Sequence, residues 1–138
     1  MAMKVFSDEW VKAYKEAINK SPYREAGKDW RAGVVALVVS KNPEIGLPED
    51  VGVWLDLHEG QCREAFACDA AKAATAPFCI TGQYSQWKQV LLKQLDPIKG
   101  MMQGRLKLKG DLPTIVRYVK ASQELVNASS TLDTEFLD

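Results

Sequence analysis

The chain has 138 residues, enough for one hydrophobic core but hardly for two, so we expect a single domain over 1–138. Its 18 basic residues balance 18 acidic ones, which argues against nucleic acid as a partner, because phosphate backbones are bound through clustered Lys and Arg. Hydrophobic residues make up 46% of the chain, which argues against disorder, and the longest apolar run, 33–39 (GVVALVV), is too short to span a bilayer.

Neither end of the chain resembles a targeting sequence. The first ten residues turn polar after one short apolar patch, so they lack the apolar region of a signal peptide. The last three, 136–138 (FLD), are not of the peroxisomal Ser-Lys-Leu type. We therefore expect a cytoplasmic location. The three cysteines lack CxxC spacing and an even count, which predicts buried free thiols and no metal site.

The N-terminal third predicts two helices. Ser7 is a suitable N-cap, and apolar residues from Trp10 to Ile18 recur at helical spacing before the chain reaches Pro22. Pro22 is tolerated in a first turn, and a second apolar stripe predicts a helix from there to about Arg31.

The middle of the chain predicts a sheet. Segment 34–39 is apolar on both faces, which is typical of a central strand. Segment 51–58 alternates apolar and polar residues and reaches a turn at Glu59-Gly60, so we expect a hairpin with a return strand over 62–68. Strict alternation in that return strand would place Cys62 and Cys68 on one face. Segment 76–81 predicts a further strand in the same sheet.

The C-terminal part returns to helical spacing. A helix is expected from Tyr84 until Pro97 stops it, followed by a short irregular or helical piece over 98–102 and a strand over 105–109. Asp111 is a suitable N-cap for a final long helix to Val126. Together these elements predict an α+β domain with a mostly antiparallel five-stranded sheet covered by helices.

Segment 80–121 resembles the C-terminal half of the type-2 sterol carrier protein domain. In that family a helix ends in a Leu-Asp-Pro or Asn-Pro element, a strand reads apolar-apolar-Gln-Gly-Lys-Leu-Lys, and Gly-Asp or Gly-Asn opens the next helix. The matching segments are 95–97 (LDP), 101–107 (MMQGRLK) and 110–111 (GD), and 53–57 (VWLDL) resembles the family's second strand. Order and spacing agree over about two thirds of the chain.

The chain also departs from the family pattern. Lys93 occupies a position that is often glycine, Arg105 stands where Lys is common, and Met101-Met102 replace a frequent aromatic pair. Methionine is flexible and adapts to irregular apolar surfaces, so the last change bears on the shape of a ligand site.

The resemblance implies a carrier that holds an apolar ligand, namely a fatty acid, an acyl-CoA or a sterol-like lipid, in an internal tunnel. It implies no catalysis, no cofactor and no metal ion. In the family the C-terminal segment lies over one end of the tunnel, so residues 130–138, with Leu132, Phe136 and Leu137, are expected to form a lid. The residues that we expect to bind the ligand are Phe78, Trp87, Val90, Leu91, Ile98, Met101, Met102, Gln103, Ile115, Val119 and Phe136.

The sequence is also compatible with other functions. The same fold can serve as a partner-binding or dimerisation module with a filled core, and the oligomeric state is open. A small enzyme would have to use Asp56, His58 or a cysteine. Lys107 and Lys109 fit a solvated strand face, or else a transient contact with an anionic membrane.

Overall fold

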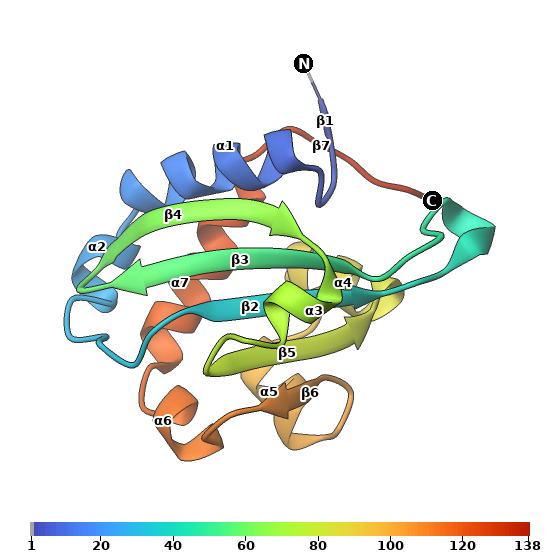
Figure 1. The fold of residues 1–138 in the computed structure, drawn as a ribbon. Coiled ribbons are helices and arrows are strands. Elements are labelled where there is room, and N and C mark those ends of the chain that lie inside the picture. Colours follow the sequence, from blue (N-terminus) through green and yellow to red (C-terminus); the bar gives the residue numbers. More distant parts are fainter. Residues whose placement is uncertain (1) are drawn as a thin grey trace.

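The computed structural model describes residues 2–138, which form a five-stranded sheet with helices on both faces and a small pair of strands at the chain ends (Figure 1). The strands are β1 (Met3–Lys4), β2 (Val35–Ser40), β3 (Val51–His58), β4 (Gln61–Cys68), β5 (Phe78–Gln83), β6 (Lys107–Lys109) and β7 (Thr134–Glu135). The helices are α1 (Asp8–Asn19), α2 (Tyr23–Ala26), α3 (Ala70–Ala73), α4 (Tyr84–Leu91), α5 (Pro97–Met102), α6 (Leu112–Val116) and α7 (Val119–Ser130), and a 3-10 turn (Pro43–Ile45) links β2 to β3.

The large sheet has the strand order β4-β3-β2-β5-β6, in which only the β2–β5 pairing is parallel. This confirms the predicted α+β class. The segment around 76–81 joins the sheet as expected, but it pairs with β2 and not with the preceding strand β4. The reason is α3, which is capped by the Asp69 side chain and carries the chain back over the sheet before β5 begins.

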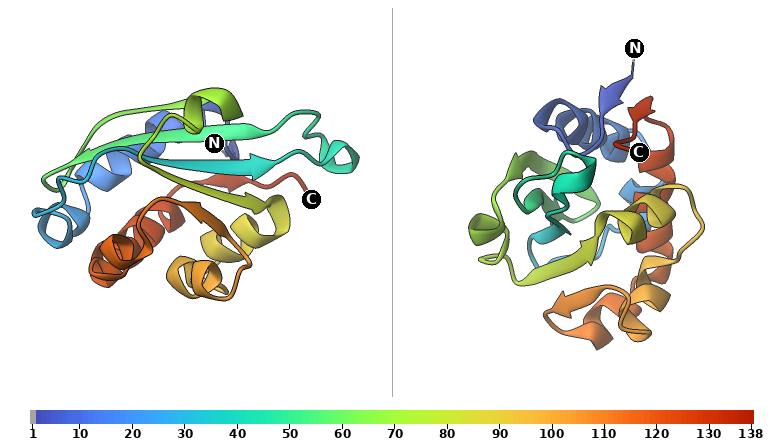
Figure 2. Two further views of the ribbon diagram at one scale, coloured as in Figure 1. Left: turned by 60° about the horizontal axis from the view of Figure 1, so that its bottom comes forward. Right: turned by 90° about the vertical axis from the view of Figure 1, so that its right-hand side faces the viewer.

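The alternation of β3 sorts its side chains onto two different faces. Val53, Leu55 and Leu57 are buried in the main core, whereas Trp54 and the other alternate residues face the opposite side. Within residues 2–138 only the short α3 covers that outer face, while the C-terminal helices lie below the inner face in the left view of Figure 2. The inner face is therefore where a thick apolar layer forms.

The expectation that Cys62 and Cys68 share one face is wrong. A β-bulge interrupts the β3–β4 ladder, because Asp56 pairs with Glu64 while the next residue, Leu57, pairs with Cys62. The extra residue, Arg63, reverses the alternation of the strand. Cys62 is consequently buried in the main core, and Cys68 packs against the small outer cluster.

The free edge of β4 is covered by side chains of α1. The Asn19 side-chain amide donates to the Cys62 carbonyl at 2.9 Å and accepts the Cys62 N–H at 2.8 Å. At the other end of the strand, the Asp8 carboxylate accepts the Ala67 N–H at 3.0 Å. Two positions on this edge are therefore already occupied from within the chain.

The Ser7 side chain accepts the Trp10 N–H, as predicted for an N-cap. Asp111 also occupies an N-cap position, but its carboxylate accepts the Thr114 hydroxyl and no backbone N–H.

Three helix lengths differ from expectation. The helix expected from Tyr84 until Pro97 ends at Leu91. The second helix, expected to reach about Arg31, has only four residues, and the final helix is broken at Arg117-Tyr118 into α6 and α7, with α7 continuing to Ser130. The break changes which residues of this segment point inward.

The chain ends are joined. β1 and β7 pair in parallel, Trp10 Nε1 donates to Thr134 Oγ1 at 2.9 Å, and the Leu137 N–H donates to the Tyr84 hydroxyl at 2.9 Å. Lys88 Nζ lies 2.7 Å from the Asp138 carboxylate. Residues 130–138 thus pack against β1 and α4, and whether they act as a lid stays a prediction. No helix within residues 2–138 is long and apolar enough to cross a membrane.

Candidate functional site

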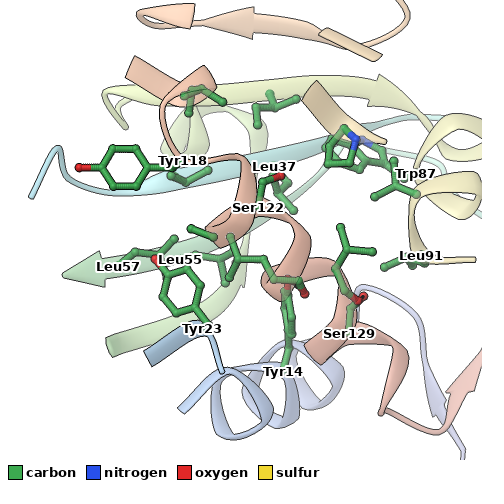
Figure 3. Close-up of a pocket in the computed structure, with 18 of the residues that line it drawn as sticks. Tyr14, Tyr23, Leu37, Leu55, Leu57, Trp87, Leu91, Tyr118, Ser122 and Ser129 are labelled. Atoms are coloured by element: carbon green, nitrogen blue, oxygen red, sulfur yellow. Dashed lines mark hydrogen bonds between the residues drawn. The ribbon is translucent and has the colours of Figure 1, made fainter. Parts of the chain in front are cut away.

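A cavity of about 110 Å³ lies between the inner face of the sheet and the helices (Figure 3). Its floor comes from β2, β3 and β5, where the register sets Val35 opposite Leu55 and Leu37 beside Ile80. The lining residues are Phe6, Trp10, Tyr14, Tyr23, Trp30, Val35, Leu37, Leu55, Leu57, Ile80, Trp87, Val90, Leu91, Pro97, Met101, Ile115, Tyr118, Ala121, Ser122, Leu125, Val126 and Ser129.

Several polar groups in the lining bond back into the protein. Tyr14 Oη donates to the Leu125 carbonyl at 2.8 Å, Trp87 Nε1 to the Val38 carbonyl at 2.9 Å, and Ser129 Oγ to the Val126 carbonyl at 2.6 Å. Burial raises the pKa of Tyr14 and Tyr23, so both phenols stay neutral. Among the described residues, the lining holds no Asp, Glu, Lys, Arg or His.

Such a wall binds by excluding water. A water molecule occupies about 30 Å³ of liquid volume, so a cavity of about 110 Å³ has room for about four groups of water or methylene size. At about 0.8 kcal/mol for each buried methylene, four of them contribute about 3 kcal/mol without any specific polar contact. The arrangement therefore suits a flexible hydrocarbon chain and offers no charged group for chemistry.

Five of the eleven expected ligand residues line this cavity: Trp87, Val90, Leu91, Met101 and Ile115. Their common feature is position, since they lie on the inward faces of α4, α5 and α6.

Three expected residues lie on the surface. Successive residues of a helix point about 100° apart, so in the six-residue α5 Met101 faces inward and Met102 is 66% exposed. Gln103 follows as the exposed C-cap of α5. Val119 is 42% exposed, because the break before α7 rotates Tyr118 into the cavity wall and Val119 out of it.

The remaining three are packed outside the lining. Phe78 is buried against Trp30, with ring centroids 5.3 Å apart, and Ile98 of α5 is buried in the main hydrophobic core. Phe136 is half-buried in the tail, where Lys88 Nζ lies 5.3 Å from its ring. A ligand role for these six residues stays a prediction.

The lining residues outside the predicted set come in equal measure from the N-terminal part of the chain, from the strands β2, β3 and β5, and from α7. Trp10, Tyr14, Tyr23 and Trp30 were recognised as apolar stripes of helices but not as parts of a ligand site. Nothing in their spacing distinguishes a cavity wall from an ordinary core. The aromatic cluster was the available signal, since Trp10 and Tyr14 lie with ring centroids 5.3 Å apart beside Phe6.

The residues considered for catalysis lie elsewhere. Asp56 and His58 are on the outer side of β3, where Asp56 pairs with Arg63 at 3.0 Å and His58 Nε2 lies 3.3 Å from the Glu59 carboxylate. Burial raises the pKa of the Cys62 thiol to about 12, so it is not a thiolate at neutral pH. Within residues 2–138, no group of three or more His, Cys, Asp and Glu side chains could hold a metal ion.

The comparison with known families agrees with the fold. The model of the SCP-2 sterol transfer family matches residues 11–122. The chain belongs to this family. A crystal structure of a sterol carrier protein 2 is 37% identical with a TM-score of 0.86, and the alignment covers 94% of this chain and 99% of that one. No curated protein sequence matches the chain.

Other sterol carrier structures extend the comparison. The solution structure of a possible sterol carrier protein from Thermus thermophilus is 36% identical, has a TM-score of 0.87, and aligns over 97% of this chain and 93% of that one. The palmitated SCP2L2 of Aedes aegypti, at 16% identity and a TM-score of 0.53 over 87% of this chain and 95% of its own, shares the fold.

Proposed function

We propose that this sterol carrier family member is a lipid carrier that holds a single fatty acyl chain, free or in an acyl-CoA, in the cavity and performs no catalysis. The observation that carries the proposal is the cavity wall, whose side chains are aliphatic, aromatic and thioether groups with neutral hydroxyls. A site of this kind binds hydrocarbon with low selectivity, because water exclusion supplies the free energy.

The size of the cavity favours an acyl chain over a rigid sterol. A flexible chain can place about four methylenes in 110 Å³ and let the rest follow the surface, whereas a fused ring system enters as one rigid body. Met101 supports this preference, since an unbranched thioether can adjust to chains of different length. A sterol-like ligand would require the walls to move apart.

Titration with a series of fatty acids tests the proposal. Trp10, Trp30 and Trp87 line the cavity and Trp54 lies on the outer face, so a Trp54→Phe variant reports mainly on the cavity by fluorescence. We expect a change in emission and a higher melting temperature with each acid, because a ligand of the folded state stabilises it by mass action. Unchanged emission and melting temperature across the series would refute carriage of acyl chains.

Native mass spectrometry of freshly purified protein complements the titration. A co-purified mass would identify the ligand class directly, and the same spectra give the oligomeric state. A dimer without ligand, together with no response to fatty acids, would favour a dimerisation module. The cytoplasmic location and transient membrane contact stay predictions.

A further inference from the structure

A surface groove of about 330 Å³ adjoins the cavity at the C-terminal ends of α4 and α7. Leu91 of α4 and Ser129 of α7 line both the groove and the cavity, so these two side chains form the wall between them. Figure 3 shows both at the same end of the cavity, away from Tyr118. The Ser130 hydroxyl donates to the Leu91 carbonyl at 3.4 Å, which ties the two helix ends together at the groove.

The wall is thin and weakly held. Leu91 is half-buried and unbranched at its β-carbon, and the hydrogen bond from Ser130 lies at the long limit for such contacts. The tail forms the outer rim of the groove through Leu132 and Phe136. A side-chain rotation at Leu91 would therefore open the cavity to the groove without unfolding a helix.

The groove has a cationic side chain at its rim. Lys93 lines it, and within residues 2–138 its ammonium has no hydrogen-bond or ion-pair partner. The nearby Lys88, in contrast, is engaged by the Asp138 carboxylate at 2.7 Å. Lys93 is therefore the cation at this groove that can accept a new anionic partner.

The backbone at Lys93 is strained. The residue has φ +62°, in the left-handed region that favours glycine. It is the residue after the C-cap of α4, where the Lys93 N–H donates to Val90 at 3.0 Å and the Gln94 N–H to Gln89 at 2.7 Å. This is the Schellman arrangement, in which glycine is usual. A lysine that replaces glycine at the cost of strain points to a role for its side chain.

We propose that a fatty acid lies with its chain passing between Leu91 and Ser129 into the cavity and its carboxylate in the groove beside Lys93. This inference rests on the proposed function and adds the orientation of the ligand and the preference for an anionic head group. The chain end then points toward Tyr118 and Trp30, at the far end of the cavity. A neutral head group would lack the charge–charge attraction to Lys93.

Paired ligands test the orientation. Binding of dodecanoate and of dodecanol is measured for the wild type and for Lys93→Gln, Lys93→Arg and Lys120→Gln. Lys120 is an exposed lysine beside Tyr118, so its variant is a matched charge control for the opposite end of the cavity. We expect Lys93→Gln to weaken dodecanoate about three-fold, as for a solvent-exposed ion pair, and to leave dodecanol unchanged.

Two further results are expected. Lys93→Arg retains the affinity for dodecanoate, and the effect of Lys93→Gln shrinks at about 1 M salt, where screening acts within roughly 3 Å. Loss of dodecanoate affinity in Lys120→Gln instead would place the carboxylate at the other end and overturn the inference. The inference is also overturned if Lys93→Gln changes the affinities for dodecanoate and dodecanol equally, or changes neither. If the wild type binds neither ligand, the proposed function itself fails.

Discussion

Filling the cavity should raise stability and lower affinity at the same time. Ala121 lies on α7, is 5% exposed and lines the cavity, so an Ala121→Leu side chain would project three more carbons into empty space. At about 0.8 kcal/mol per carbon this burial contributes about 2.4 kcal/mol, from which about 1 kcal/mol of side-chain entropy is subtracted. We expect the ligand-free protein to gain about 1–1.5 kcal/mol.

The same three carbons displace about three ligand methylenes. The ligand then loses about 2.4 kcal/mol of burial, which weakens binding of a fatty acid about fifty-fold. Urea unfolding without ligand and fluorescence titration with dodecanoate measure the two effects. Opposite signs of the two changes distinguish a filled cavity from a damaged fold.

Ala128 on the same helix provides the control. It is 2% exposed and lies in the core without lining the cavity. Ala128→Leu should overpack the core and destabilise the protein by about 1–3 kcal/mol. If Ala121→Leu destabilises the protein as much as Ala128→Leu does, the space is not available and a filled core is the better description.

Three further predictions concern strain, the tail and pH. Lys93→Gly should relieve the left-handed backbone and raise the free energy of unfolding by about 1 kcal/mol in urea, while Lys93→Ala should not. Truncation after Ser130 removes the Thr134 contact with Trp10 but should leave the fold intact, as measured by far-UV circular dichroism. The ligand should dissociate faster in a stopped-flow displacement assay, and an unchanged off-rate would exclude a lid. Burial raises the pKa of the Cys62 thiol from 9.0 to about 12, so the unfolded chain loses this proton at a lower pH than the folded one. The free energy of unfolding should therefore be intact below about pH 9 and fall between pH 9 and pH 12 by up to about 1.4 kcal/mol per pH unit. In Cys62→Ala the fall should be less steep.

The fold was largely predictable because its signals are local. The Ser7 cap, the Glu59-Gly60 turn and the alternation of β3 each depend on a few adjacent residues, and each has the expected structure. The bulge at Arg63 and the break at Tyr118 were not predictable, since neither position carries a glycine or proline. Both change the direction in which the following residues point.

The cavity was predictable only in part for the same reason. Residues that follow an undisturbed helical stripe, such as Trp87 and Val90, face the cavity, whereas Val119 follows the break and faces outward. The aromatic residues of α1 reach the cavity through tertiary packing, which their own spacing does not encode. The family resemblance implies an apolar ligand site but does not specify which side chains line it.

The contacts of Asn19 and Asp8 with β4 also bear on self-association. An open strand invites a second chain to extend the sheet, and that route leads to linear aggregates. Here the outward amide groups of Cys62 and Ala67 are already used by α1, so adding a strand would first require those bonds to break. These contacts of α1 therefore oppose edge-to-edge growth of the sheet at β4.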